Sequence, residues 1–216
     1  MAIIYPRAMP AGHWFQSAEF KLADLSVANT LQSGAVQTMD LGDPLWSATF
    51  RTHVVEAEDR QMWQAWALSL RRGRKFLAFD PEKEFPAAYG SAVLNLTRAI
   101  GGAFDGSATL GAVTATTVQL LGLPALYQAK AGDMLSFPWN GVRALHQVVE
   151  DAAANSSGIA TIAMEPPVRL NPAPAASATV DLVKPACVML LKPGTFSAPA
   201  SYDPQPVSFE AVQAIV

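Results

Sequence analysis

The chain has 216 residues, of which 50% are apolar and 15% are charged, and its net charge is -3. This length allows one large or two small domains with a proper core, while the charge content is well below the roughly 25% of an average soluble domain. The weak negative charge disfavours a nucleic-acid binder, and the single cysteine, Cys187, excludes an internal disulfide.

The N-terminal part of the sequence predicts short strands separated by turns. Strands are expected over 20–27, 34–39 and 45–55, with the turn residues Gly42, Asp43 and Pro44 before the third. Within 45–55, apolar and polar residues alternate, which is typical of a strand with one buried face. An antiparallel sheet is therefore expected in this part of the chain.

The hydrophobic period changes at Glu56, where the sequence predicts an amphipathic helix over 56–72. Apolar residues then recur at helical spacing, acidic residues fill the first turn and basic residues the last, and Gly73 follows as a left-handed cap. Because such an apolar stripe usually faces the core, we expect Trp63 and Trp66 to pack on the neighbouring sheet.

Beyond the helix, the sequence predicts a second group of strands. A strand over 74–80 ends at Pro81, and the composition then shifts to Ala, Gly, Thr and Val. The later expected strands are 114–121, two strands around the turn within 126–137, 142–149, 158–164, 187–191 and 207–216.

These elements predict a mainly β (α+β) fold with two units. Residues 1–87 would form an N-terminal antiparallel β-sandwich that includes the helix 56–72. Residues 88–168 would form a small all-β domain, either a barrel or a sandwich. In 169–216, a proline-containing linker would lead to terminal strands that return to the first sheet or complete the second.

No segment of the sequence predicts membrane insertion or secretion. The apolar stretch 120–127 is interrupted by Gly122 and Pro124 and is much shorter than the roughly 20 residues of a membrane helix. The N-terminus lacks a charged region followed by an apolar core, so we expect folding in the cytoplasm.

The residues that most often carry catalysis are scattered. His13, His53 and His146 have no metal-ligand spacing, and we expect Cys187, in an apolar strand, to be buried and inert. Nucleophile elbows and phosphate loops are missing, and the clustered carboxylates are explained by a helix start or a turn. We therefore expect no catalytic, cofactor or metal site and no enzymatic activity.

One aromatic residue is a candidate for ligand contact. Trp139 follows Phe137 and Pro138 and precedes Asn140 at a predicted turn, where a ring can be exposed and can stack on a sugar face or contact a partner. The alternative is structural, because the same ring can cover the end of a β-sandwich.

The order of the segments resembles the distal tail proteins of long-tailed (siphovirus-like) bacteriophages and gene transfer agents. Each motif is short, and the resemblance depends on their order from about residue 17 to residue 192. The motifs are Ser33–Gln37, Trp46–Phe50, Leu68–Asp80, Ala131–Phe137, Arg143–Glu150 and Gly158–Arg169.

The resemblance implies a structural subunit of the virion, located at the tail tip and assembled in the host cytoplasm. The N-terminal sandwich would form a homo-oligomeric, hexameric ring that joins the tail tube protein to the baseplate hub and tail fibre proteins. DNA would pass through the channel without specific binding, and no cofactor or membrane insertion is implied. Low charge suits this reading, because the centres of permanent interfaces are poor in charge.

Three other functions stay open at this point. Another tail or baseplate adaptor would have the same setting but a different position in the particle. A carbohydrate-binding host-recognition module would use Trp139, and an enzyme such as a wall-degrading hydrolase would need a convergent pocket that the scattered histidines do not predict.

Overall fold

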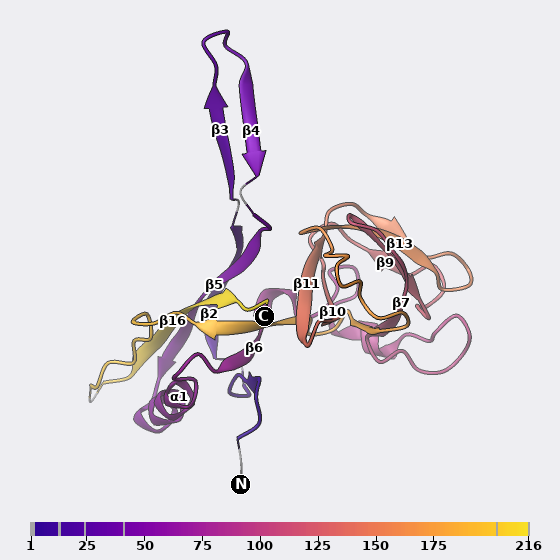
Figure 1. Ribbon diagram of the computed structural model, residues 1–216. Coiled ribbons are helices and arrows are strands. Elements are labelled where there is room, and N and C mark those ends of the chain that lie inside the picture. Colours follow the sequence, from indigo (N-terminus) through magenta and orange to yellow (C-terminus); the bar gives the residue numbers. More distant parts are fainter. Residues whose placement is uncertain (1–2, 13, 24, 41, 202, 216) are drawn as a thin grey trace.

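The computed structural model describes residues 3–12, 14–23, 25–40, 42–201 and 203–215, with the exception of the Asp40 side chain. It is mainly β, with one α-helix and two short 3-10 helices, η1 (Pro81–Lys83) and η2 (Gly90–Asn95). The mainly β prediction is confirmed. Two bodies and a projecting hairpin are visible in Figure 1.

The first body is built on a six-stranded sheet with the order β1-β6-β15-β16-β5-β2. Its neighbouring strands are antiparallel, apart from the two-residue pairing of β1 with β6. Two of its central strands, β15 and β16, come from the C-terminal end of the chain. The strands are β1 (Arg7–Ala8), β2 (Phe15–Ala23), β5 (Leu45–Val55), β6 (Lys75–Phe79), β15 (Ala186–Leu191) and β16 (Gln205–Gln213).

Helix α1 (Ala57–Ser69) covers one face of this sheet. Trp63 and Trp66 are 0% and 2% exposed, and the Trp66 ring lies 5.1 Å from the ring of Phe76 and 5.4 Å from that of Phe209. Burial of large aromatic rings is among the strongest contributions to a core. The prediction that both tryptophans pack on the neighbouring sheet is confirmed.

The predicted C-terminal end of the helix is wrong by three residues. The helix ends at Ser69, and no basic residue lies in its last turn. Arg72 and Gly73 both have left-handed backbones, with φ of 65° and 70°. Since this conformation does not continue a right-handed helix, Arg71 and Arg72 lie in the turn that leads to β6.

The second body is a closed barrel with the strand order β10-β11-β13-β8-β7-β14. Its interior is a separate apolar cluster that includes Phe104, Leu120, Leu135 and Phe137. The barrel strands are β7 (Ser107–Val113), β8 (Thr117–Leu121), β10 (Met134–Trp139), β11 (Val142–Val148), β13 (Ala160–Glu165) and β14 (Thr179–Asp181).

Two strands of the barrel were not predicted from the sequence. Strand β7 lies in a glycine- and alanine-rich segment for which no strand was predicted, and β14 lies beyond residue 168. Since β14 pairs with both β10 and β7, the strand that closes the barrel follows directly after the expected linker, in a stretch for which no strand was predicted. A two-stranded ribbon of β9 (Gln128–Ala129) and β12 (Ala152–Ala153) flanks the barrel.

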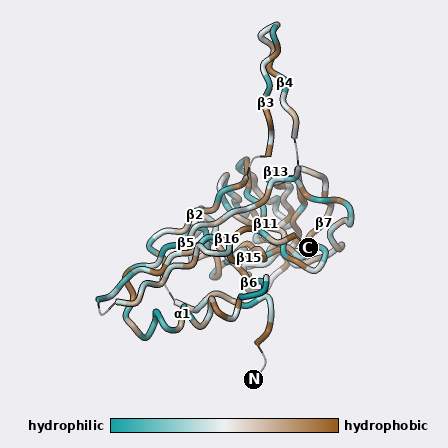
Figure 2. The backbone as a smooth tube through the Cα atoms, turned by 60° about the vertical axis from the view of Figure 1, so that its left-hand side comes forward, coloured by the Kyte–Doolittle hydropathy of each residue, from teal (hydrophilic) through white to brown (hydrophobic). Residues whose placement is uncertain are grey.

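Strands β3 (Ser26–Thr30) and β4 (Val36–Asp40) form the hairpin that projects from the first body. They continue from β2 and lead into β5, and the hairpin stands clear of both bodies in two views (Figures 1 and 2).

The two bodies pack against each other along β10, β11 and β15. The Trp46 indole Nε1 donates to the Leu145 carbonyl at 2.8 Å, and Met134 and Leu145 of the barrel belong to the core of the first body. The sheet therefore holds the barrel through both apolar and polar contacts. Of the helices that the structure describes, none has the length and apolarity to span a membrane.

Candidate interaction surfaces

Trp139, the sequence candidate for a ligand contact, lies at the end of β10 where the barrel meets the first sheet. Its ring is only 8% exposed and packs in a small cluster with Val142 and Val188. This burial favours the structural alternative, in which the ring covers the end of a β structure. A sugar stacks on an accessible aromatic face, and the Trp139 ring does not present one.

The indole of Trp139 is also held by the segment that follows the barrel strands. Its Nε1 donates to the Pro172 carbonyl at 2.7 Å, and the Arg169 guanidinium lies over the ring, 5.6 Å from its centroid. The Arg169 Nε is 2.9 Å from an oxygen of Asp43, which belongs to the turn before β5. Trp139 thus joins the barrel to the segment 169–178.

Cys187 and His53 lie on different strands of the first sheet and differ in exposure. Cys187 is fully buried, and burial raises the pKa of its thiol, which confirms the prediction of a buried cysteine. His53 is exposed on β5, while His13 lies outside the described residues. Among the residues that the structure describes, no three His, Cys, Asp or Glu side chains are placed to hold a metal ion.

His146, on the barrel strand β11, has an unusual environment. It is 3% exposed, and its ring stacks on Phe137 with centroids 5.0 Å apart. Nδ1 lies 2.7 Å from the Pro166 carbonyl, while Nε2 has no partner among the described residues. A carbonyl only accepts, so Nδ1 carries the proton and Nε2 is bare. Burial lowers the pKa of His146 to about 4.

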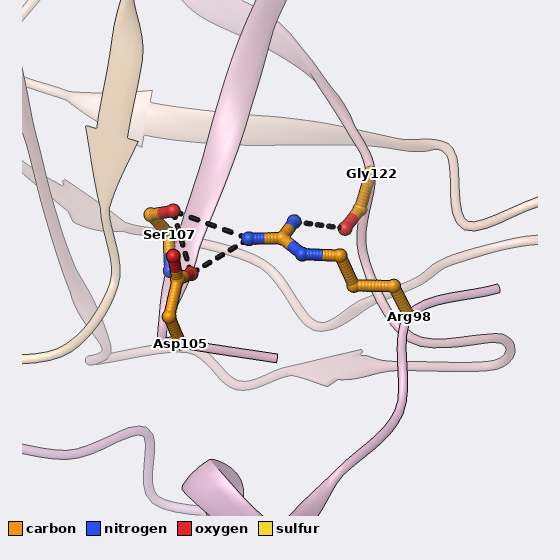
Figure 3. A network of polar contacts seen from close by, with 4 residues as sticks. All are labelled: Arg98, Asp105, Ser107 and Gly122. Carbon is orange, nitrogen blue, oxygen red and sulfur yellow. Dashed lines mark hydrogen bonds and ion pairs between the residues drawn. The ribbon is translucent and has the colours of Figure 1, made fainter. Parts of the chain in front are cut away.

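A polar cluster of the barrel body is centred on Arg98 (Figure 3). Its guanidinium donates to the Gly122 carbonyl at 2.5 Å, to Asp105 at 2.6 Å and to Ser107 at 3.2 Å. Hydrogen bonds from Ser107 and, to a smaller extent, the charge of Arg98 lower the pKa of Asp105. Every member contacts another member or the backbone, so the cluster fastens two loops.

The first body presents an open sheet edge. Among the described residues, β2 pairs with β5 alone, and η1 lies beside it. Phe15, Phe20 and Leu22 on β2 are half-buried against the core, so apolar side chains remain partly exposed along this edge. A long, partly apolar edge strand favours pairing with another chain.

The hairpin presents a second exposed surface, which is uncharged up to the last residue of β4. From Leu25 to Met39 the sequence contains no Asp, Glu, Lys or Arg, and all residues of β3 are exposed. Val36 and Met39 are 64% and 60% exposed. Figure 2 shows hydrophobic stretches along both strands of the hairpin.

An apolar groove lies on the side of the molecule opposite the hairpin. It has a volume of about 660 Å³ and runs between the C-terminal half of α1 and the connection from β15 to β16. Leu68, which is 63% exposed, and Phe196 contribute apolar walls, and Arg71 and Arg72 lie at the rim.

Neither the hairpin nor the groove was predicted from the sequence as an exposed surface. The run without charges from Leu25 to Met39 was a usable signal, because an exposed turn is normally rich in polar or charged residues. The groove had no such signal, since it joins the helix to a connection more than 100 residues later in the chain. No protein-family model and no curated protein sequence matches the chain.

Proposed function

We propose that the chain is a structural ring subunit of a bacteriophage-type tail tip, a distal tail protein that joins the tail tube to the hub and fibres. The observation that carries the proposal is the open edge of the first sheet, where β2 has a strand partner on one side only among the described residues. The segment order that resembles distal tail proteins supports the same function.

An open edge at one end of a sheet suits head-to-tail association. In such an interface one surface of a subunit meets a different surface of the next, and a suitable rotation closes the assembly into a ring. Pairing along β2 would also complete the burial of Phe20 and Leu22, which the single chain leaves half-exposed. The ring would therefore remove both an aggregation hazard and an apolar edge.

The face of the sheet opposite α1 suits a channel through which a charged polymer passes without binding. On β2 and β5 this face carries Glu19, Lys21, Thr49 and Arg51, and Glu210 follows on β16. Acidic and basic side chains alternate, so no positive stripe forms that would retain DNA. The Glu210 carboxylate is 2.8 Å from Lys192 Nζ, so the negative charge of Glu210 is balanced by an ion pair within the same chain.

The two-layer sandwich predicted for residues 1–87 remains a prediction within this proposal. A single chain contributes one six-stranded sheet and one helix. The barrel would project from the ring as the unit that contacts other tail proteins.

Electron microscopy of the purified full chain and of particles that contain it tests the proposal. We expect closed rings, with the barrels at the periphery, and a mass by light scattering that is an integral multiple of 22.9 kDa. A chain that stays monomeric at every concentration and occupies no ring in the particle contradicts it. A position elsewhere in the tail would instead support another tail or baseplate adaptor.

A further inference from the structure

We propose that the hairpin 25–39 docks on a second copy of this chain, in the groove between α1 and the β15–β16 connection. This inference rests on the proposed ring function and adds a contact that the open β2 edge does not supply. The hairpin and the groove would be the two unlike halves of one head-to-tail interface.

The hairpin has the properties of a segment that is stabilised by a partner. Its strands β3 and β4 pair with each other and with no other strand among the described residues. A two-stranded hairpin that packs on nothing is at best marginally stable in water. Its apolar side chains, Val27, Val36 and Met39, are between 41% and 64% exposed, so no core in the same chain holds them.

The apolar residues of the hairpin lie on both of its faces. Val27 and Met39 are directly opposite in the strand register and share one face, and Val36, opposite Thr30, lies on the other. Leu31, 49% exposed, follows at the turn. A flat surface would bury one face only, whereas a groove receives both together with the turn.

The groove matches the hairpin in polarity and in charge. Its walls include Leu68, Leu70 and Phe196, which suit an uncharged apolar segment. At its rim, neither the Arg71 nor the Arg72 guanidinium has a partner among the described residues, and both side chains are exposed. In the sequence, the charged residues that flank the uncharged run are acidic, namely Asp24 and Asp40. An uncharged segment between two acids is thus complementary to an apolar groove with a basic rim.

The arrangement of the fold makes this contact intermolecular. The hairpin leaves the sheet on one side, and α1 lies on the opposite side in both views (Figures 1 and 2). The hairpin therefore does not reach the groove of its own chain. A second copy is the occupant that carries the complementary surface, and the proposed ring places copies next to one another.

Cysteine pairing tests the contact directly. In the full chain, a Val36→Cys and Leu68→Cys double variant should form disulfide-linked oligomers under mild oxidation, and the single variants should give dimers at most. The buried Cys187 is common to all variants. A matched double variant, Val36→Cys with Thr161→Cys at an exposed position of the barrel strand β13, should form no such series. An equal yield from both double variants would overturn the inference.

A charge introduced into the hairpin provides an independent measurement. Val36→Asp should weaken self-association at least tenfold in sedimentation experiments, because an apolar interface does not solvate a carboxylate. Leu126→Asp, at a barrel position with a similar exposed fraction of 66%, should leave association unchanged. Arg71→Glu with Arg72→Glu should weaken association less than Val36→Asp does, since rim charges contribute less than the apolar centre.

The outcomes separate the inference from the proposed function. If the wild-type chain forms rings while Val36→Asp assembles normally and Val36 does not cross-link to Leu68, the hairpin inference is wrong and the ring function stands. A wild-type chain that forms no ring and is found in no ring contradicts both.

Discussion

The barrel and the six-stranded sheet solve the problem of strand edges in opposite ways. The barrel closes on itself with β14, so its strands are paired on both sides within one chain. The sheet ends on β2, a nine-residue strand, and extends into a hairpin whose two strands pair only with each other among the described residues. The strand edges of one body are thus satisfied within the chain, while the other body exposes the surfaces that association would cover.

The largest expected effect is a loss of stability in the core of the first body but not in the barrel. Trp66→Ala removes a ring that contacts Phe76 and Phe209 and an indole that donates to the Ala8 carbonyl at 2.9 Å. We expect a loss of about 3–5 kcal/mol in the free energy of unfolding, the usual cost of a large cavity. Urea denaturation with hydrogen exchange measures it, and barrel amides should keep their protection in the variant. Met62→Ala, on the same helix but 39% exposed, is the control. Equal loss of protection in both bodies would show that they unfold as one unit.

The barrel should be sensitive to acid at His146. The pKa of His146 is about 4 in the folded chain and about 6.5 when unfolded, so its contribution to stability is fully present above pH 6.5. As the pH falls from 6.5 to 4, His146 binds a proton more readily in the unfolded chain than in the folded chain. The free energy of unfolding therefore falls by about 3 kcal/mol.

Wild-type and His146→Gln chains, compared by urea denaturation across this pH range, isolate that contribution. The glutamine amide still donates to the Pro166 carbonyl but does not titrate, so the variant should show a shallower loss. His53→Gln, at an exposed position on β5, should behave like the wild type. Identical pH profiles for wild type and His146→Gln would contradict the assignment.

A smaller effect is expected at the Arg98 cluster, which fastens loops of the barrel. Arg98→Ala removes three hydrogen bonds and leaves the Gly122 carbonyl without its side-chain partner. Loss of such bonds costs about 1–3 kcal/mol, and thermal unfolding should show it. Arg51→Ala on the exposed face of β5 is the control, with an expected change within about 0.5 kcal/mol. If the two variants are equally stable, the cluster does not stabilise the barrel.

The smallest effect is expected at Trp139. Trp139→Phe keeps an aromatic ring against Val142 and Val188 but removes the hydrogen bond to the Pro172 carbonyl, so about 1 kcal/mol of stability should be lost. A glycan array probed with the wild-type chain should give no signal that the substitution removes. A sugar signal that depends on Trp139 would restore the carbohydrate-binding hypothesis.

Local patterns in the sequence predicted the elements with a clear period. The alternation over 45–55 and the helical spacing of Trp63 and Trp66 reflect the faces that these elements bury, and β5 has the predicted bounds. Strand β7 was missed because small residues such as Gly111 and Ala112 give no β signal on their own. Its place in the barrel depends on pairing with β8 and β14, which lie elsewhere in the chain.

Trp139 shows why a candidate site is harder to predict than a strand. Its neighbours in the sequence indicate a turn, but its exposure depends on Pro172 and Val188, which fold over it from distant segments. The groove beside α1 was invisible for the same reason, because its wall at Phe196 comes from the far end of the chain.

The sequence by itself determined the mainly β character, the one helix with its buried tryptophans, and a buried Cys187. These properties follow from the local hydrophobic period and from composition, which do not depend on distant partners. Only the tertiary structure decided that β14 closes the barrel, that the Trp139 ring is covered, and that β2 and the hairpin are left open. Such properties depend on which distant segments meet, and no local pattern encodes that choice.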